Sequence, residues 1–408
     1  MLNRMLQNCF YLHMKFFSAD IIITCSSAPV KGGIVVTDDE GRITEILNNR
    51  QQLGLDTEVA EYHGLICPGF VNTHCHLELS HLISQVPAGT GLQGFIRELI
   101  RLRNSDEYKI LDAARNADRQ MYESGVIAVG DISNTTASLE VKKNSKIHYH
   151  TFIELFDLHE SRAESLLDEG LALLQTYQSN GLEASIVPHA PYTVSSKLLK
   201  LISNHAYAEG SLLTIHNQES QYENEMFQSG TGELITALRD IAPDLYYDWH
   251  HTGFNSLASV FALLPKCNKI AFVHNTYSSQ EDVKWAQLYS MLVWWCFCPK
   301  ANMHIEGKLP DIPMIRNLSR NICIGTDSLA SNDKLSMVDE IKCIQDNYPD
   351  ILLEEIISWS CLGGAEFLGI HREFGTLEKG KRPGLVLIEG LDLYSMKSMN
   401  GMKSSRII

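Results

Sequence analysis

The chain has 408 residues, of which 44% are hydrophobic and 20% charged, a composition typical of a globular protein with two domains or with one large domain and a small companion. Lys and Arg total 34 and Asp and Glu total 49, so the formal net charge is −15, which argues against nucleic-acid and anionic-membrane partners because no basic surface can neutralise their phosphates. Ten cysteines without disulfide-like spacing, and no apolar run as long as a membrane span, indicate a reduced cytoplasmic protein.

The N-terminal segment does not resemble a secretory signal, because residues 1–13 contain no clean apolar region and no small-residue cleavage site. Met14 directly precedes a convincing strand, so translation from Met14 is an alternative to translation from Met1, and we expect little structure before it. Three short apolar strands follow, and residues 38–41 between the last two predict a hairpin turn. The predicted strands are Ala19–Thr24, Gly33–Thr37 and Ile43–Ile46.

The middle of the chain alternates apolar runs with longer amphipathic segments such as Ala163–Ser179 and Ser195–Ala208. This alternation predicts an α/β fold with a parallel sheet, and eight repeats predict a distorted (β/α)8 barrel. An open doubly wound sheet is the alternative, but no glycine-rich phosphate loop follows the first run. The runs are Gly69–Asn72, Val126–Val129, His150–Leu155, Ala184–Val187, Leu212–Ile215, Ile270–Val273, Met291–Phe297 and Ile322–Gly325.

The two ends of the chain are predicted to share one small β domain, because neither end has enough apolar surface for a core of its own. Near the C-terminus, a turn-forming segment at 375–381 precedes the predicted strand Leu385–Ile388. The sequence therefore predicts a β-sandwich built from residues 1–65 and 375–408, with the barrel formed by residues 66–374.

Polar residues of metal-ligand type follow five of the eight runs. In a barrel the strand ends at one face converge on a single site, so we expect these side chains to lie together although they are far apart in the sequence. They are His74 and His76 after the first run, His189 after the fourth, His216 and Glu219 after the fifth, His274 after the sixth and Asp327 after the eighth.

The spacing of His74 and His76 suits a metal site, because residues two apart on an extended strand point to the same face. His216 and Asp327 would complete a set of three imidazoles and one carboxylate, which fits one divalent ion, Zn²⁺ or alternatively Fe²⁺. An open coordination position would take a water molecule and lower its pKa towards neutrality. A single histidine at a strand end is more often structural than a ligand, so this prediction depends on the joint pattern.

Two further residues are candidates for proton transfer. Glu219 could take a proton from the attacking water and deliver it to a leaving nitrogen, and His274 could orient the water and stabilise developing charge. Glu78 and Ser80 follow the histidine pair and could either reach the substrate or brace the first loop. The aromatic and polar segment 246–253 could either cap the site or pack as an ordinary helix–loop element.

On these residues the chain resembles the amidohydrolase superfamily, in its branch of chlorohydrolases and aminohydrolases of purines, nucleosides and triazines. The matching segments run through the whole chain and are highly specific for the superfamily. They are residues 68–77 (PGFVNTHCHL), 188–193 (PHAPYT), 215–219 (IHNQE), 273–275 (VHN), 298–302 (CPKAN) and 325–332 (GTDSLASN).

The resemblance implies that residues like His74, His76, His216 and Asp327 bind the metal and that residues like Glu219, His274 and Asp327 carry the proton chemistry. It also implies that residues like His189 contact the substrate. Two-metal members usually carry a carboxylated lysine at the end of the fourth strand, where this chain has Pro188-His189, so the resemblance implies a single metal.

Within the branch, the chain looks like aminodeoxyfutalosine deaminase and is similar to deaminases of S-adenosylhomocysteine and methylthioadenosine. Ser328 replaces a common glycine and Asn217-Gln218 replaces a more typical Leu-Ser, which affects the substrate side of the site. The resemblance implies hydrolytic deamination of an aminated heterocycle, an adenosine-type nucleoside such as aminodeoxyfutalosine.

Two alternatives stay open on the sequence. One is hydrolysis of another ring substituent or of a cyclic amide at the same site, as in chlorohydrolases and in guanine or cytosine deaminases. The other is a barrel without activity that retained these residues by descent, which a complete set of ligand and acid–base residues disfavours. The partner is expected to be a small heterocyclic molecule, and a homodimer is an open alternative to a monomer.

Overall fold

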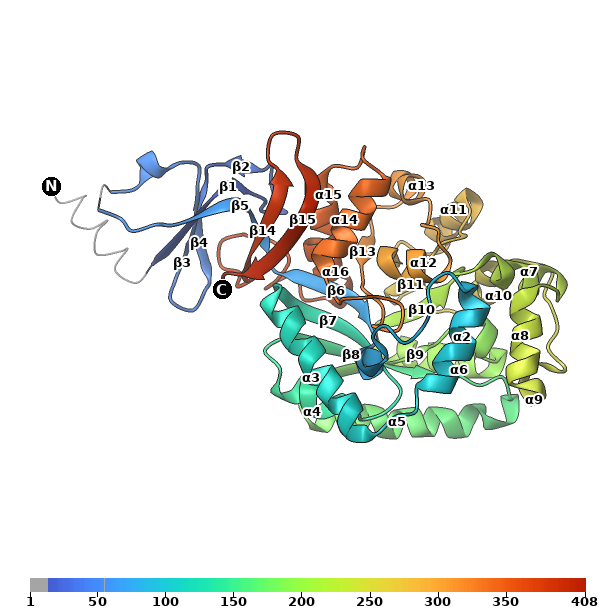
Figure 1. Cartoon of the computed structure of the whole chain (residues 1–408). Helices are drawn as coiled ribbons and strands as arrows, with labels where there is room; N and C mark the ends of the chain where they lie inside the picture. Colours follow the sequence, from blue (N-terminus) through green and yellow to red (C-terminus); the bar gives the residue numbers. More distant parts are fainter. Residues whose placement is uncertain (1–13, 55) are drawn as a thin grey trace. The chain divides into compact units, whose positions relative to one another are not determined.

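The computed structural model describes residues 14–54 and 56–408, so the expectation of little structure in residues 1–13 lies outside the described residues. The chain forms two compact units (Figure 1). The first contains the chain up to Val71 together with Met121–Ile127 and Ser336–Ile408, and the second contains Asn72–Gln120 and Ala128–Leu335. Every residue of the predicted metal and proton set belongs to the second unit.

The first unit is built on a seven-stranded sheet that joins both ends of the chain, with β14 and β15 beside β5 in Figure 1. Three strands of this sheet, β2, β5 and β15, were not among the predicted strands. The strand order is β15-β14-β5-β1-β3-β4, with β2 paired to β1. The bounds are β1 Lys15–Ile22, β2 Val30–Lys31, β3 Ile34–Thr37, β4 Ile43–Leu47, β5 Ala60–Pro68, β14 Leu385–Asp392 and β15 Lys397–Arg406.

Alternating side chains explain why these segments form strands with two buried faces. Phe16 and Ile34 belong to one apolar cluster, whereas Phe17 and Val35 belong to another. Neighbouring residues of a strand point to opposite faces, so the two clusters lie on the two sides of the sheet. The predicted hairpin turn is confirmed by the hydrogen bond from the backbone N–H of Asp38 to the carbonyl oxygen of Arg42.

The eight predicted apolar runs all form strands, in two parallel four-stranded sheets whose order follows the chain. Parallel strands covered on both faces are apolar throughout, which is why continuous runs identified them. The expected α/β class with parallel sheets is confirmed. The sheets are β6-β7-β8-β9 and β10-β11-β12-β13, with bounds Phe70–Cys75, Val126–Ser133, His148–Leu155, Glu183–Pro188, Leu213–Asn217, Ile270–His274, Val293–Phe297 and Ile322–Ile324.

Short contacts join the two sheets at both of their junctions. The backbone N–H of His216 donates to the carbonyl oxygen of His189 at 2.9 Å, next to β9 and β10. At the other junction Cys75 and Asp327 form an isolated parallel bridge. Among the described residues only short contacts of this kind link the two sheets, without a continuous ladder of strand hydrogen bonds. The strand pairing therefore establishes two parallel sheets and does not establish one closed barrel.

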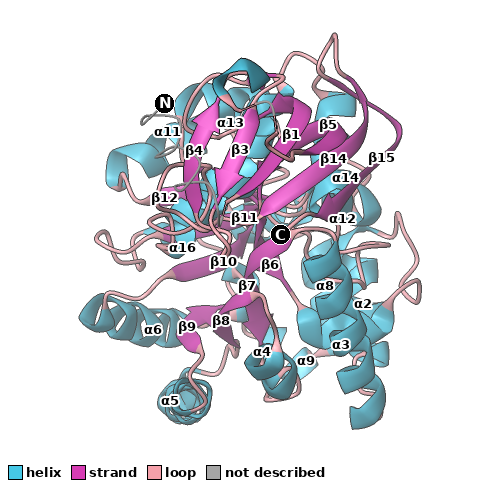
Figure 2. Cartoon of the chain, turned by 90° about the vertical axis from the view of Figure 1, so that its left-hand side faces the viewer, coloured by secondary structure: helices cyan, strands magenta, loops and turns pink. Residues whose placement is uncertain are grey.

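The helices cover the parallel sheets, and Figure 2 shows α5 and α6 beside β8 and β9. The predicted helix Ala163–Ser179 is α5, without any change of bounds. Ser195 caps the start of α6 by accepting a hydrogen bond from the backbone N–H of Leu198, and Gly210 ends it in the left-handed conformation. None of the described helices is both long and apolar enough to cross a membrane.

The remaining helices have ordinary lengths for an α/β protein. Their bounds are α2 Gly91–Leu102, α3 Glu107–Glu123, α4 Leu139–Asn144, α6 Ser196–Glu209, α7 Gln221–Ser229, α8 Glu233–Ile241, α9 Pro243–Tyr246, α10 Ser256–Phe261, α11 Gln280–Tyr289, α12 Pro299–Ile305, α13 Ile312–Leu318, α14 Met337–Asn347, α15 Leu353–Ser358 and α16 Gly364–Leu368.

Gly325 allows β13 and β6 to approach each other where they lead into the predicted metal residues. A Cβ atom at position 325 would lie 2.7 Å from both the Cβ atom and the carbonyl oxygen of His74. The His74 backbone nitrogen lies 2.8 Å from the same position. Two of the three neighbours are therefore backbone atoms, and a rotamer change could not relieve the clash.

We predict that Gly325→Ala destabilises the protein by about 2 kcal/mol or more, because the backbone of β6 must shift to accept the methyl group. Chemical denaturation of the variant measures this loss. Gly54→Ala is the matched control, since its new Cβ would meet only the Thr57 hydroxyl oxygen, at 3.6 Å. Equal stability of the two variants would contradict the close approach.

Candidate active site

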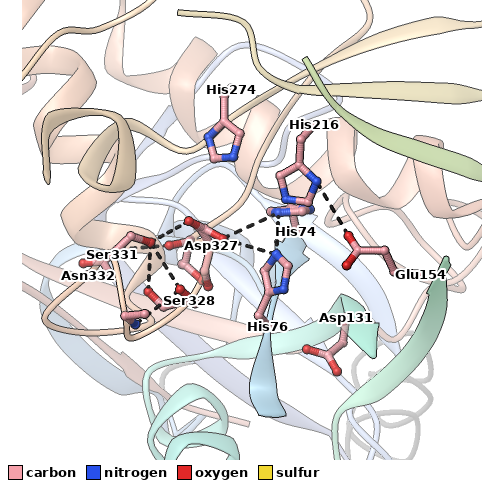
Figure 3. A network of polar contacts seen from close by, with 12 residues as sticks. His74, His76, Asp131, Glu154, His216, His274, Asp327, Ser328, Ser331 and Asn332 are labelled. Atoms are coloured by element: carbon pink, nitrogen blue, oxygen red, sulfur yellow. Dashed lines mark hydrogen bonds and ion pairs between the residues drawn. The ribbon is translucent and has the colours of Figure 1, made fainter. Parts of the chain in front are cut away.

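The structure brings His74, His76 and Asp327 together at the junction of β6 and β13 (Figure 3). The Nε2 atoms of His74 and His76 are 3.1 Å apart. One carboxylate oxygen of Asp327 lies 3.4 Å from His76 Nε2 and 3.7 Å from His74 Nε2. Polar side chains from both ends of the second unit therefore meet at one point.

His216 and His274 complete this cluster from the second sheet. Each occupies or directly precedes the last position of its strand, β10 and β11, and both are buried. The side-chain nitrogens of His74, His216 and His274 lie within 4.8 Å of one another. The predicted convergence of residues from strand ends is present in the structure.

Backbone hydrogen bonds hold Asp327 against β6. The backbone N–H groups of Thr326 and Asp327 both donate to the carbonyl oxygen of His74 at 3.0 Å. The Ser331 hydroxyl donates to Asp327 Oδ2 at 2.5 Å, which leaves Oδ1 directed at the histidines. The carboxylate is thus fixed in both position and orientation.

The loops after the strands adopt backbone conformations that non-glycine residues rarely take. His274, Asn275 and Asp327 have φ values of 72°, 58° and 57°, and Gln218 has a φ value of 46°. Such conformations cost free energy and persist only where the surroundings enforce them, which is common at functional sites. Here they turn the chain sharply so that side chains at strand ends face the cluster.

The tautomer of His216 follows from its hydrogen bond. Its Nδ1 atom lies 2.8 Å from the carbonyl oxygen of His189. A carbonyl oxygen only accepts, so Nδ1 carries the proton and Nε2 presents its lone pair to the cluster. This arrangement orients a metal-binding imidazole in the usual way.

Burial keeps His76, His216 and His274 neutral. It lowers the pKa of His76 to about 3 and that of His274 to about 4, and it holds the pKa of His216 well below its ordinary value. Burial alone would raise the pKa of Asp327, but the adjoining His74 and His76 side chains hold it well below the usual range. Neutral imidazoles beside an ionised carboxylate are the protonation states that metal binding requires.

The geometry of this donor set fits one small divalent ion. Two ligands about 2.05 Å from one ion in a tetrahedral site are about 3.3 Å apart, close to the 3.1 Å between the Nε2 atoms of His74 and His76. Imidazole nitrogens and a carboxylate suit zinc and similar transition metals. His74, His76, His216 and Asp327 could therefore hold a metal ion.

Glu219 and His274 lie beside this donor set. His274 Nε2 is 3.7 Å from Glu219 Oε1, and both side chains are buried. The backbone N–H of Glu219 donates to Glu223 Oε2 at 2.9 Å, which anchors the loop. Burial, reinforced by the charge of Asp327, raises the pKa of the Glu219 carboxyl well above its ordinary value. The raised pKa favours the protonated form of Glu219 beside the donor set.

A cavity of about 600 Å³ opens onto the cluster, entirely within the second unit. Its far wall is apolar and comes from α2, α5, α8 and α9, whereas its floor carries the histidines. The segment predicted either to cap the site or to pack contributes Tyr246, whose hydroxyl donates to the Tyr192 carbonyl oxygen at 3.0 Å. Apolar lining residues include Leu92, Phe95, Leu99, Leu158, Leu238 and Leu245.

The residues predicted to contact the substrate divide into two groups. His189 and Ser328 line the cavity. Glu78 and Ser80 are not part of the cavity wall that the described residues form. The Glu78 carboxylate instead accepts hydrogen bonds from the backbone N–H of Asn134 at 3.2 Å and the Thr135 hydroxyl at 3.0 Å, so in this structure it braces the loop after β7.

Three other histidines lie outside the cluster, namely His150, His159 and His304. His150 contacts the Ser185 hydroxyl at 3.0 Å, and His159 contacts the Asp157 carboxylate at 3.0 Å. His304 lies 3.2 Å from the carbonyl oxygen of Val86.

Several polar residues of the cavity wall were not anticipated, among them Glu154, Asn134 and Arg103. Glu154 lies one residue before the end of β8, and burial raises its pKa to about 7. An acidic residue inside the apolar run His150–Leu155 was a detectable signal, because a charged group is rarely buried in a strand without a role. Asn134 and Arg103 carry no such signal, since they belong to polar segments.

Comparison with known proteins agrees with this geometry. The model of the amidohydrolase family matches residues 65–408. The chain is 25% identical over 334 residues to adenosine deaminase of Helicobacter pylori, covering 79% of this chain and 78% of that protein. It is 25% identical over 361 residues to aminodeoxyfutalosine deaminase of a Nitratiruptor species, covering 85% of each.

A solved structure shares the fold. The crystal structure of Helicobacter pylori aminofutalosine deaminase in complex with methylthio-coformycin matches with a TM-score of 0.79 and 22% identity, covering 92% of each chain. At this identity the likeness shows the fold alone.

We predict that His216→Ala abolishes metal retention, because the variant removes one of the few neutral nitrogen ligands of a compact site. Elemental analysis of the purified variant and of the unmodified protein measures the metal content. We expect one ion per chain in the unmodified protein and only a small residue in the variant.

His159→Ala is the matched control, since His159 contacts Asp157 outside the cluster. A full metal complement in His216→Ala would contradict the ligand assignment. Two ions per chain in the unmodified protein would contradict a one-metal site.

Proposed function

Because the chain belongs to the amidohydrolase family, we propose that it is a metal-dependent hydrolytic deaminase of adenosine-type nucleosides. The observation that carries this proposal is the buried Glu219 side chain 3.7 Å from His274, next to a compact histidine–aspartate set. Relatives that cover most of the chain are named adenosine deaminase and aminodeoxyfutalosine deaminase, which supports the reaction and the substrate class. An aminohydrolase adds water to the ring carbon and releases ammonia.

We propose that His74, His76, His216 and Asp327 hold a single divalent ion, with zinc the best match to the donor set and Fe²⁺ the alternative. β9 ends in Pro188 and His189 follows it, so no lysine is present there to bridge a second ion. The ion supplies Lewis acidity that lowers the pKa of water at the site towards neutrality.

The chain's own residues divide the proton chemistry between them. Ionised Asp327, which Ser331 holds in orientation, accepts a proton from the attacking water and passes it to the departing amino group, which leaves as ammonia. Glu219 donates its own proton to the ring nitrogen and takes back the proton that the added hydroxyl group loses as the ring carbonyl forms. His274 orients the water and stabilises negative charge that develops on oxygen.

The distribution of polar and apolar residues in the cavity wall suits a nucleoside that carries an apolar substituent on its sugar. The site floor is polar, whereas residues such as Phe95 and Leu245 make the far wall apolar. Aminodeoxyfutalosine is our leading candidate, and the fold neighbour bound to methylthio-coformycin supports an adenosine-like ligand. His189 and Ser328 line the same space and are proposed substrate contacts.

We further propose that the two parallel sheets close into a distorted (β/α)8 barrel. The hydrogen bond between His216 and His189 and the bridge between Cys75 and Asp327 support this closure. Four points stay predictions. They are the β-sandwich, the domain boundaries that place residues 66–374 in the barrel, the cytoplasmic location and the alternative of a homodimer.

A panel of substrates tests the proposed function. We expect ammonia release from adenosine-type nucleosides, most efficiently from aminodeoxyfutalosine, and little from cyclic amides or chlorinated triazines. Coupled detection of ammonia measures each rate. Preferential hydrolysis of a cyclic amide, or loss of a ring substituent other than the amino group, would overturn the assignment.

We predict that Glu219→Gln retains the metal but loses activity by about 100-fold or more, because the amide cannot transfer a proton. Turnover and metal content are measured on the same preparation. Glu225→Gln is the matched control, since its carboxylate accepts a hydrogen bond from the Thr231 hydroxyl away from the cluster. Near-normal turnover of Glu219→Gln would refute the proton role.

A further inference from the structure

Glu154 is a buried carboxylate that the proposed deamination does not use. Its side chain is 4% exposed, and it lines the cavity beside the histidine cluster. The side-chain nitrogen Nδ2 of Asn134 donates to Glu154 Oε2 at 3.2 Å and to the backbone carbonyl oxygen of Glu154 at 3.0 Å. These two hydrogen bonds orient the Glu154 carboxylate. The other oxygen, Oε1, is buried without a hydrogen-bond partner among the described residues. A buried acceptor oxygen without a partner would be satisfied by a bound ligand that donates a hydrogen bond to it.

A second metal ion is a poor match to Glu154. The ligand atoms of Glu154, His189 and His216 lie within 4.8 Å of one another, which by distance alone would suit an ion. However, the His216 nitrogen nearest to Glu154 is Nδ1, 3.7 Å away, and it carries a proton that it donates to the His189 carbonyl oxygen. Only two ligands then remain, too few for a protein site of this kind.

His189 presents a second acceptor next to Glu154. Its Nδ1 atom lies 2.7 Å from the Thr193 hydroxyl, and that hydroxyl donates its single proton to the Ala190 carbonyl oxygen at 3.1 Å. With the hydroxyl proton directed at the carbonyl oxygen, Nδ1 is the donor to Thr193 and Nε2 is left as an acceptor. Two neighbouring acceptors at the cavity wall suit a pair of hydroxyl groups on adjacent carbons.

Charge around Glu154 favours neutral donors over a cation. The Arg103 guanidinium donates to Asn134 Oδ1 at 3.5 Å, so a positive charge lies next to the residue that orients Glu154. This charge would repel an ammonium group. Hydroxyl groups carry no such penalty and gain a charge-assisted hydrogen bond to the carboxylate.

Glu154 lies on the side of the site away from the proton-transfer residues, where the sugar attached to the reacting ring would lie. Figure 3 shows Glu154 and His274 on opposite sides of His216. The His216 ring is stacked on the His274 ring, with 5.4 Å between the ring centroids. The proton-transfer residues Glu219 and His274 therefore occupy one side of the site, and Glu154 with His189 occupies the other.

We propose that Glu154 determines substrate specificity by accepting hydrogen bonds from the vicinal hydroxyl groups of the substrate's sugar, with His189 as the second acceptor. This inference rests on the proposed function, since it assigns the nucleoside's sugar to the wall opposite the proton-transfer residues. It makes Glu154 a substrate-binding residue rather than a metal ligand.

Comparison of adenosine with 2′,3′-dideoxyadenosine tests the proposal. We expect the unmodified enzyme to prefer adenosine by at least about tenfold in kcat/KM, the factor that one hydrogen bond to a charged group provides. Glu154→Gln should lower kcat/KM for adenosine by about tenfold and change that for the dideoxy compound by less than about threefold. An equal loss on both substrates, or none on adenosine, would overturn the proposal.

Two further measurements keep the test independent of folding and of turnover. Glu169→Gln makes the same chemical change at an exposed position of the same cavity and should leave the ratio between the substrates unchanged. Dissociation constants of both nucleosides on the Glu219→Gln enzyme should show the same preference without turnover. If the unmodified enzyme releases no ammonia from either nucleoside while this binding preference is intact, only the proposed function is overturned. Equal binding of the two nucleosides would overturn the role of Glu154.

Discussion

The carboxylate of Asp327 is a buried anion 3.4 Å from His76, and the rest of the site depends on keeping it there. An ionised group without partners would be costly in this environment. The chain offsets that cost with the Ser331 hydroxyl on one oxygen and the His74 and His76 rings facing the other. The hydrogen bond from the Asp327 backbone N–H to the His74 carbonyl oxygen also joins the segment after β13 to β6. The same contact therefore supports both the fold and the site.

Around this anion the cavity separates three kinds of surface. Glu219 and His274 form a side suited to proton transfer, and Glu154 with His189 forms a side of hydrogen-bond acceptors. The remaining wall, with residues such as Phe95, is apolar. A ligand that carries an aminated ring, hydroxyl groups and an apolar extension satisfies all three, in agreement with the nucleoside substrates of the relatives.

The fold was predictable where burial is complete and unpredictable where it is partial. The eight parallel strands are continuous apolar runs because both of their faces are covered. β5 starts with the mostly exposed residues 60–63, and β15 is mostly exposed along Lys397–Arg406, so neither stands out from a loop. Both acquire their strand conformation from pairing with β14, a long-range contact that local sequence does not encode.

The sequence by itself determined the residue types at the strand ends, and with them the expectation of one metal, one acid and one orienting histidine. Only the tertiary structure decided which polar residues face the cavity. Glu78, close to the histidines in sequence, turns towards the loop after β7, whereas Glu154, distant in sequence, lies against His216. The reason is physical: strand ends converge by backbone pairing, which a repeating pattern reveals, but the direction of one side chain depends on hydrogen-bond partners that folding brings from elsewhere.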